Sequence, residues 1–120
     1  FIGSPAMNFF KGKRDGANFR TEGGAAWPLP PGIASPAGRP IVYGVRPEHL
    51  QLAAAGVPAT VQVIEPTGAE TQVIARVGSA QIVGAFRERV TARPGETITL
   101  SADPSLVHLF DAETGMRCNA

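Results

Sequence analysis

The stretch TQVIARVGSAQIVGAF, from Thr71 to Phe86, decides the fold class of this chain. Every second side chain from Val73 to Val77 is apolar, whereas Gln72 and Arg76 are polar. A period of two is typical of an antiparallel strand with one buried face. The pair Gly78-Ser79 then predicts a turn before a second apolar run. The stretch therefore predicts two neighbouring strands.

The same short apolar runs recur along most of the sequence. Strands are predicted over residues 8–13, 17–21, 27–29, 41–45, 60–65, 71–77, 81–86 and 96–101. Asp15-Gly16 is a hairpin signal, and Arg93-Pro94-Gly95-Glu96 places proline and glycine where a turn favours them. Helix is restricted to single turns at Pro47–Leu50 and Asp103–Leu106, each opened by a proline.

Short strands at regular spacing predict an all-β fold, a small OB-like Greek-key barrel or barrels. A barrel is favoured over a sandwich because closure removes exposed strand edges. We expect one domain over residues 1–120, with a Pro-rich loop over residues 28–40. Two barrel-like halves divided at that loop remain an alternative. Phe1 begins inside an apolar segment without an initiator methionine, so residues 1–8 are interpreted as the tail of a linker from a preceding domain.

Composition argues against several classes of function. The net charge of +1 does not favour nucleic-acid binding by bulk electrostatics, and no apolar run reaches the roughly 18 residues of a membrane span. Cys118 is the single cysteine, which excludes an internal disulfide and a cysteine-rich zinc site. The sequence contains no phosphate-loop, GxSxG or HExxH motif. We therefore predict no catalytic, cofactor-binding or metal-binding residues.

Three groups of polar residues are candidate sites. His49 and His108 are far apart in sequence, and we interpret each as a structural hydrogen-bonding residue. Glu65 and Glu70 straddle a turn, where carboxylates are usually solvated. The basic cluster consists of Lys11, Lys13, Arg14 and Arg20 and is interrupted by Asp15. It is interpreted as a solvated strand face, with phosphate contact as the alternative.

Four segments in order carry a resemblance to a known family. They are FIGSPAMN at residues 1–8, GVRPEHL at 44–50, EPTGAETQ at 65–72 and HLFD at 108–111. The first is similar to the exit from the nucleotide-binding domain in ATPase subunits of maltose- and glycerol-phosphate-type ABC importers. The others resemble motifs of the same subunits' C-terminal TOBE (transport-associated OB) domain. The segment between residues 20 and 39 matches only loosely.

The resemblance implies a non-catalytic accessory domain that regulates and dimerises an importer for sugars or sugar phosphates. ATP and Mg²⁺ would then bind a preceding domain, and this chain would hold no cofactor. The implied partners are a second ATPase subunit in a homodimer, the membrane permease indirectly, and a regulatory protein, with no nucleic acid. The implied location is the cytoplasmic face of the bacterial plasma membrane.

The resemblance also selects positions expected to be structural or at an interface. These family-motif positions are Arg46, Pro47, Glu48, His49, Gly68, Glu70, Thr71, His108 and Phe110. Pro47 holds Arg46 extended, and the Arg46 guanidinium can pair with a carboxylate of this barrel or of a partner. Gly68 supplies a positive φ at its turn. The HLF segment is expected to close the core.

The residues leave two other functions open. An OB module for single-stranded nucleic acid needs exposed aromatic side chains and a basic groove. Most aromatic residues here stand at core-like positions, and the net charge is small. A pocket for a small oxyanion, as in molybdate-binding relatives of this barrel, is the other alternative.

Overall fold

The computed structural model describes residues 7–32 and 39–118, and strands dominate this part of the chain. The strands are β1 (Asn8–Asp15), β2 (Asn18–Thr21), β3 (Ala26–Pro28), β4 (Pro40–Val45), β5 (Leu50–Pro66), β6 (Thr71–Val77), β7 (Ala80–Phe86), β8 (Thr97–Ala102) and β9 (His108–Asp111). Two single turns of 3₁₀ helix, η1 (Pro47–His49) and η2 (Pro104–Leu106), join them. The all-β, OB-like fold class is confirmed. The predictions for residues 1–6 and 33–38 lie outside the described residues.

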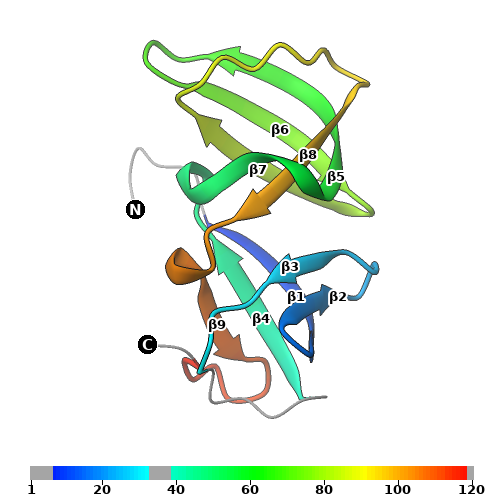
Figure 1. Ribbon diagram of the computed structural model, residues 1–120, viewed down its shortest axis with the longest axis vertical. Coiled ribbons are helices and arrows are strands. Elements are labelled where there is room, and N and C mark those ends of the chain that lie inside the picture. The colour runs from blue at the N-terminus through cyan, green and yellow to red at the C-terminus, as the bar shows by residue number, and fades with distance from the viewer. Residues whose placement is uncertain (1–6, 33–38, 119–120) are drawn as a thin grey trace.

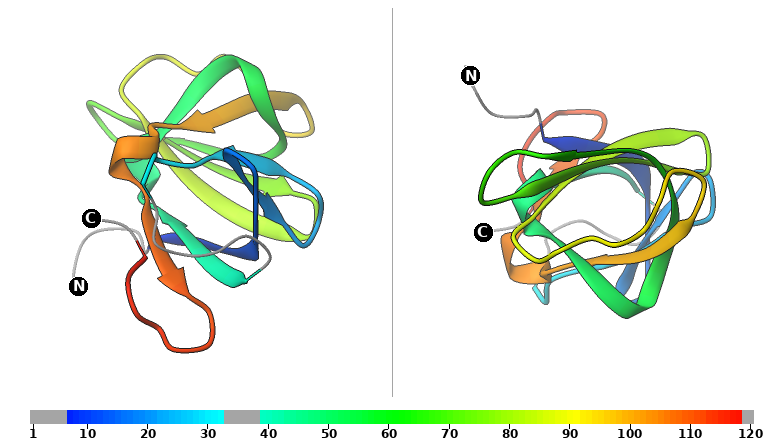
Figure 2. Two further views of the ribbon diagram at one scale, coloured as in Figure 1. Left: turned by 60° about the horizontal axis from the view of Figure 1, so that its bottom comes forward. Right: turned by 90° about the horizontal axis from the view of Figure 1, so that it is seen from above.

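The strands form two antiparallel sheets, one below the other in Figure 1. Sheet A has the order β3-β2-β1-β4-β9, and sheet B has the order β7-β6-β5-β8. Both sheets curl, so that the molecule seen from above resembles a ring (Figure 2). The division between the sheets does not fall at the Pro-rich loop, because β1 and β4 come from either side of it and pair within sheet A.

The chain passes between the sheets through the two predicted turns. It leaves sheet A after β4 through η1 and returns from β8 to β9 through η2 (Figure 1). Proline opens each turn, and Asp103 caps η2 by accepting a hydrogen bond from the Ser105 amide at 2.9 Å. A capping side chain satisfies an amide that the short helix leaves without a partner. Both predicted turns are confirmed.

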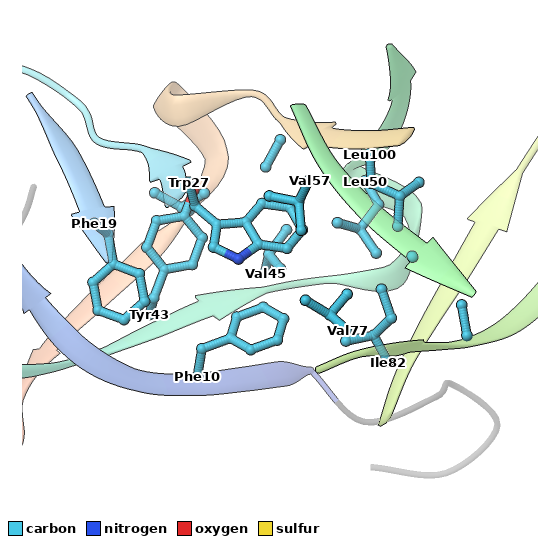
Figure 3. Packing of buried hydrophobic residues seen from close by; sticks show 14 of the residues in the cluster. Phe10, Phe19, Trp27, Tyr43, Val45, Leu50, Val57, Val77, Ile82 and Leu100 are labelled. Atoms are coloured by element: carbon cyan, nitrogen blue, oxygen red, sulfur yellow. The ribbon is translucent and has the colours of Figure 1, made fainter. Parts of the chain in front are cut away.

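The buried hydrophobic residues of both sheets form one continuous cluster. Its sheet A side is aromatic: Phe10 stacks on Trp27 with ring centroids 5.2 Å apart, and Phe19 stacks on Tyr43 at 4.9 Å. Its sheet B side is aliphatic apart from Phe86. Trp27 lies between the two groups, close to Val57 (Figure 3). The two sheets therefore share a core, with this side chain at its centre.

A buried amide also joins the two sheets. The Asn8 side chain, on β1, donates to the Val83 carbonyl of β7 at 2.9 Å and to the Val45 carbonyl at 3.2 Å. It also accepts from the Val83 amide at 2.8 Å. Asn8 is only 8% exposed, so these bonds satisfy a polar group that would be costly to bury alone. The Asn8 side chain thus bonds the backbone of β7, an edge strand of sheet B, as a neighbouring strand would.

β5 is longer than the sequence predicted. The predicted strand over residues 60–65 is only its second half, and the first half begins at Leu50. The pairing with β8 shifts register between Leu52 and Val57, which indicates a bulge. A bulge interrupts the period of two that identifies a strand in a sequence. The long, bent β5 reaches β6 on one side and β8 on the other.

Candidate functional site

The family motif GVRPEHL forms the corner where the chain leaves sheet A. Arg46 is extended, with φ −73° and ψ 148°, as predicted for a residue before proline. Pro47 is buried, and the His49 amide donates to the Arg46 carbonyl at 2.9 Å, which closes the turn. Glu48 is exposed at the middle of η1. Because η1 packs against β7, this corner presents Glu48 beside the end of sheet B.

The second motif forms the turn between β5 and β6. Gly68 has a φ of +84°, which confirms the predicted conformation. The Thr67 amide donates to the Glu70 carbonyl at 2.8 Å, and the Thr67 hydroxyl donates to it at 3.3 Å. The hydrogen bonds that close this turn are therefore donated by Thr67. The turn leaves the Glu70 carboxylate free to face outward.

The fold brings these two motifs together at one hollow. Thr71 pairs with Phe86, so Glu70 before one strand lies beside the residues that follow the other. The hollow has a volume of about 390 Å³, and its charged lining consists of Glu48, Glu70, Arg87 and Glu88. We call it the acidic hollow. With three carboxylates and one guanidinium, its charge is negative, and it suits a cationic side chain of a partner.

Sequence reasoning missed part of the acidic hollow and placed one residue differently. Arg87 and Glu88 belong to a charged run directly after a predicted strand, and only the pairing of β6 with β7 brings them next to Glu70. Glu65 flanks the same turn but does not line the hollow. Its strand position pairs with Gln72 instead. The two carboxylates that straddle the turn therefore have different surroundings.

A positive corner lies on the other side of η1. His108 begins β9 opposite Gly44, two residues before Arg46. Burial lowers the pKa of His108, and repulsion from Arg117, Arg46 and His49 lowers that pKa further. The fold thus brings the two histidines near each other, but among cations, which does not favour a metal ion. Within residues 7–32 and 39–118, no group of three or more His, Cys, Asp or Glu side chains is placed to hold one.

Two polar groups of this corner have no partner within the described residues. The Nδ1 atom of His49 is buried and forms no hydrogen bond there. The Arg46 guanidinium, which is half-buried, also forms no hydrogen bond or ion pair with a described residue. Arg46 therefore forms no ion pair with another described residue of the barrel. Its guanidinium is open to a carboxylate from a partner protein.

The sequence matches two family descriptions over most of its length. Residues 3–50 match the MalK OB fold domain, and residues 43–110 match the TOBE domain. The chain belongs to the TOBE domain family. The resemblance seen in the sequence and the fold that it implied are both confirmed.

Curated relatives of this TOBE domain are larger ATP-binding proteins. It is 45% identical to an uncharacterized ABC transporter ATP-binding protein, y4oS, of Sinorhizobium fredii, over 98% of this chain and 32% of the relative. It is 42% identical to the sn-glycerol-3-phosphate import ATP-binding protein UgpC of Escherichia coli O157:H7, over 98% of this chain and 34% of the relative. The chain thus spans about a third of the length of these relatives.

A solved structure shares the fold of this TOBE domain. It is the cytoplasmic molybdate-binding protein ModG with molybdate bound, with a TM-score of 0.67 over 85% of this chain and 94% of that chain. The sequence identity is 17%, so the likeness concerns the fold alone. No helix in the described part of the TOBE domain is long and apolar enough to cross a membrane.

The last motif of the TOBE domain divides between core and surface. Leu109 is fully buried, whereas His108 and Phe110 on either side of it are half-buried. Buried and half-buried residues alternate in this way along a strand that has one face in the core. The core-closing role predicted for the whole HLF segment therefore applies to Leu109. Phe110 pairs with Val42 and bridges to Arg117, away from the acidic hollow.

Proposed function

We propose that this TOBE domain is the accessory domain of the ATP-binding subunit of a bacterial ABC importer for sugars or sugar phosphates. The observation that carries the proposal is its identity of 45% and 42% to two ABC ATP-binding proteins across 98% of its length. In this proposal, ATP and Mg²⁺ bind a preceding domain. The TOBE domain itself performs no chemistry.

The proposed work of the domain is contact and regulation. Two copies of the intact subunit form a homodimer at the cytoplasmic face of the membrane and reach the permease indirectly. The acidic hollow and the Arg46 guanidinium, which has no partner among the described residues, support this proposal, because they offer charges of opposite sign to a partner. Charges that complement a partner give specificity and fast association. A regulatory protein is a further partner for the same surfaces.

The placement of the aromatic side chains supports this proposal over nucleic-acid binding. Phe10, Phe19, Trp27 and Tyr43 are buried in the core. Single-stranded nucleic acid is bound by stacking bases on exposed aromatic rings. Among the described residues, Phe9 is the aromatic side chain that is exposed, at 58%. One exposed ring does not form a stacking platform for successive bases.

The coding sequence before Phe1 tests the proposed parent. We expect it to encode a phosphate loop, an LSGGQ signature and a Walker B aspartate. We also expect the intact subunit to hydrolyse ATP and the 120-residue chain to hydrolyse none. A different preceding domain, or an intact protein without ATPase activity, would contradict the proposal.

A further inference from the structure

A second hollow lies on sheet A, and none of the family-motif positions lines it. It has a volume of about 500 Å³ and crosses β2, β1 and the start of β4. Its lining includes four cationic side chains, those of the basic cluster, and two acidic ones, Asp15 and Glu22. The lining therefore carries a charge of +2. We call this site the lysine hollow.

Both lysines of the chain face the lysine hollow. Lys11 and Lys13 are exposed, and they alternate along β1 with Phe10 and Gly12, which are buried. The period of two places both ammonium groups on the outer face, with their Cα atoms about 7 Å apart. Arg20 of β2 pairs with Lys13, so a third cation lies on the same face. The strand pairing thus gathers positive charge that the sequence shows only as a loose cluster.

The two lysines differ from the arginines in having no partner. Arg20 forms an ion pair with Asp15 at 2.9 Å and donates to the Gly24 carbonyl at 3.2 Å. Arg14 donates to the Gly16 carbonyl at 3.3 Å. Within residues 7–32 and 39–118, the side chain of neither Lys11 nor Lys13 forms a hydrogen bond or an ion pair. Asp15 is paired with Arg20, and Glu22 forms no ion pair with either lysine in this part of the chain, so the two ammonium groups remain open to an anion.

The floor of the lysine hollow is apolar. Ile41 is fully buried beneath it, and Pro40 and Ala112 line the same side. The Ala112 amide donates to the Pro40 carbonyl at 3.1 Å, so this backbone does not offer its donor to a ligand. An apolar floor beside two cations suits a ligand with a charged group and an uncharged body. Inorganic phosphate would contact the cations of such a site but not its apolar surface.

We propose that the lysine hollow binds a small organic phosphate. A phosphate monoester carries a charge of about −1.5 to −2 at neutral pH, which matches two open ammonium groups. The remaining part of the ligand would lie on the exposed apolar surface formed by Pro40 and Ala112. This binding site does not depend on the proposed role in an importer, because it is formed entirely within the described chain.

Nuclear magnetic resonance titration of the 120-residue chain with phenyl phosphate tests the proposal. We expect chemical-shift changes at the amides of residues 11–15 and 20–22. The double substitution K11Q/K13Q should raise the Kd by about tenfold or more, since each lost contact to a charged group is worth at least that factor in many proteins. The double variant R76Q/R93Q removes the same charge from exposed positions of the sheet B region and should leave the Kd unchanged.

Three results would overturn the proposal. The first is an unchanged Kd in K11Q/K13Q. The second is equal affinity for inorganic phosphate and phenyl phosphate, because the apolar floor would then contribute nothing. The third is tighter binding of a single-stranded oligonucleotide to the same residues, which would favour a nucleic-acid surface. Circular dichroism of K11Q/K13Q should match that of the unaltered chain, because both side chains are exposed.

Discussion

Sheets A and B have the same antiparallel construction but different side chains. Sheet A turns four aromatic rings inward and presents both lysines outward, whereas the interior of sheet B is aliphatic apart from Phe86 and the sheet ends at the acidic hollow. Trp27 and Asn8 connect the two sheets. One fold with one shared core therefore presents two surfaces of opposite charge.

The largest effect is expected at the centre of the shared core. Trp27→Ala should lower the free energy of unfolding by about 3–5 kcal/mol, because it leaves a large cavity between the two sheets. The Trp27 indole N–H is buried and has no acceptor among the described residues. Trp27→Phe removes that N–H and should therefore cost less than about 1.5 kcal/mol. Urea unfolding followed by circular dichroism measures the free energy of unfolding of both variants. Equal losses in Trp27→Ala and Trp27→Phe would show that the indole N–H contributes a bond.

The next effect concerns the polar connection between the sheets. Asn8→Ala removes three hydrogen bonds and leaves both Val83 backbone groups without the Asn8 amide, so it should cost about 2–3 kcal/mol. Hydrogen exchange at the Val83 amide should become faster. Asn18→Ala is the matched control, since Asn18 is exposed and its cost should stay within about 0.5 kcal/mol. Equal costs for the two variants would contradict the role assigned to Asn8.

The sequence predicted the regular parts of both sheets because their signals are local. The alternation in β6 and β7 and the prolines of η1 and η2 are readable from neighbouring residues alone. The first half of β5 could not be predicted, because its bulge breaks the alternation and its pairing with β8 is distant in sequence. The acidic hollow was missed for the same reason.

A smaller effect on stability is expected from Gly→Ala substitutions in one turn of each sheet. Gly68→Ala, in the β5–β6 turn, should cost about 1 kcal/mol, because its φ of +84° is unfavourable for a side chain. Gly23→Ala, after β2, should be neutral or slightly stabilising, since Gly23 does not have a positive φ and its nearest contact is at 3.9 Å. Thermal unfolding of both variants measures the difference. A stabilised Gly68→Ala would contradict the turn geometry.

The smallest effect is a pH dependence at the positive corner beside sheet A. The pKa of His108 is below its ordinary value of 6.5, so the unfolded chain binds a proton more readily than the folded chain. Stability from this group is therefore present above pH 6.5 and falls as the pH drops through the lowered pKa. Urea midpoints at pH 7.5 and 5.5 should differ less in His108→Gln than in the unaltered chain. An unchanged difference would show that His108 is not responsible.

The role in subunit pairing is tested most directly by sedimentation of the intact subunit with ATP. We predict a dimer for the unaltered subunit and a shift toward monomer for Glu70→Arg, which reverses one charge in the acidic hollow. Glu65→Arg, on the other side of the same turn and outside the hollow, should remain dimeric. A monomeric unaltered subunit in the presence of ATP, or equal dimerisation by both variants, would show that the acidic hollow has no role in subunit pairing.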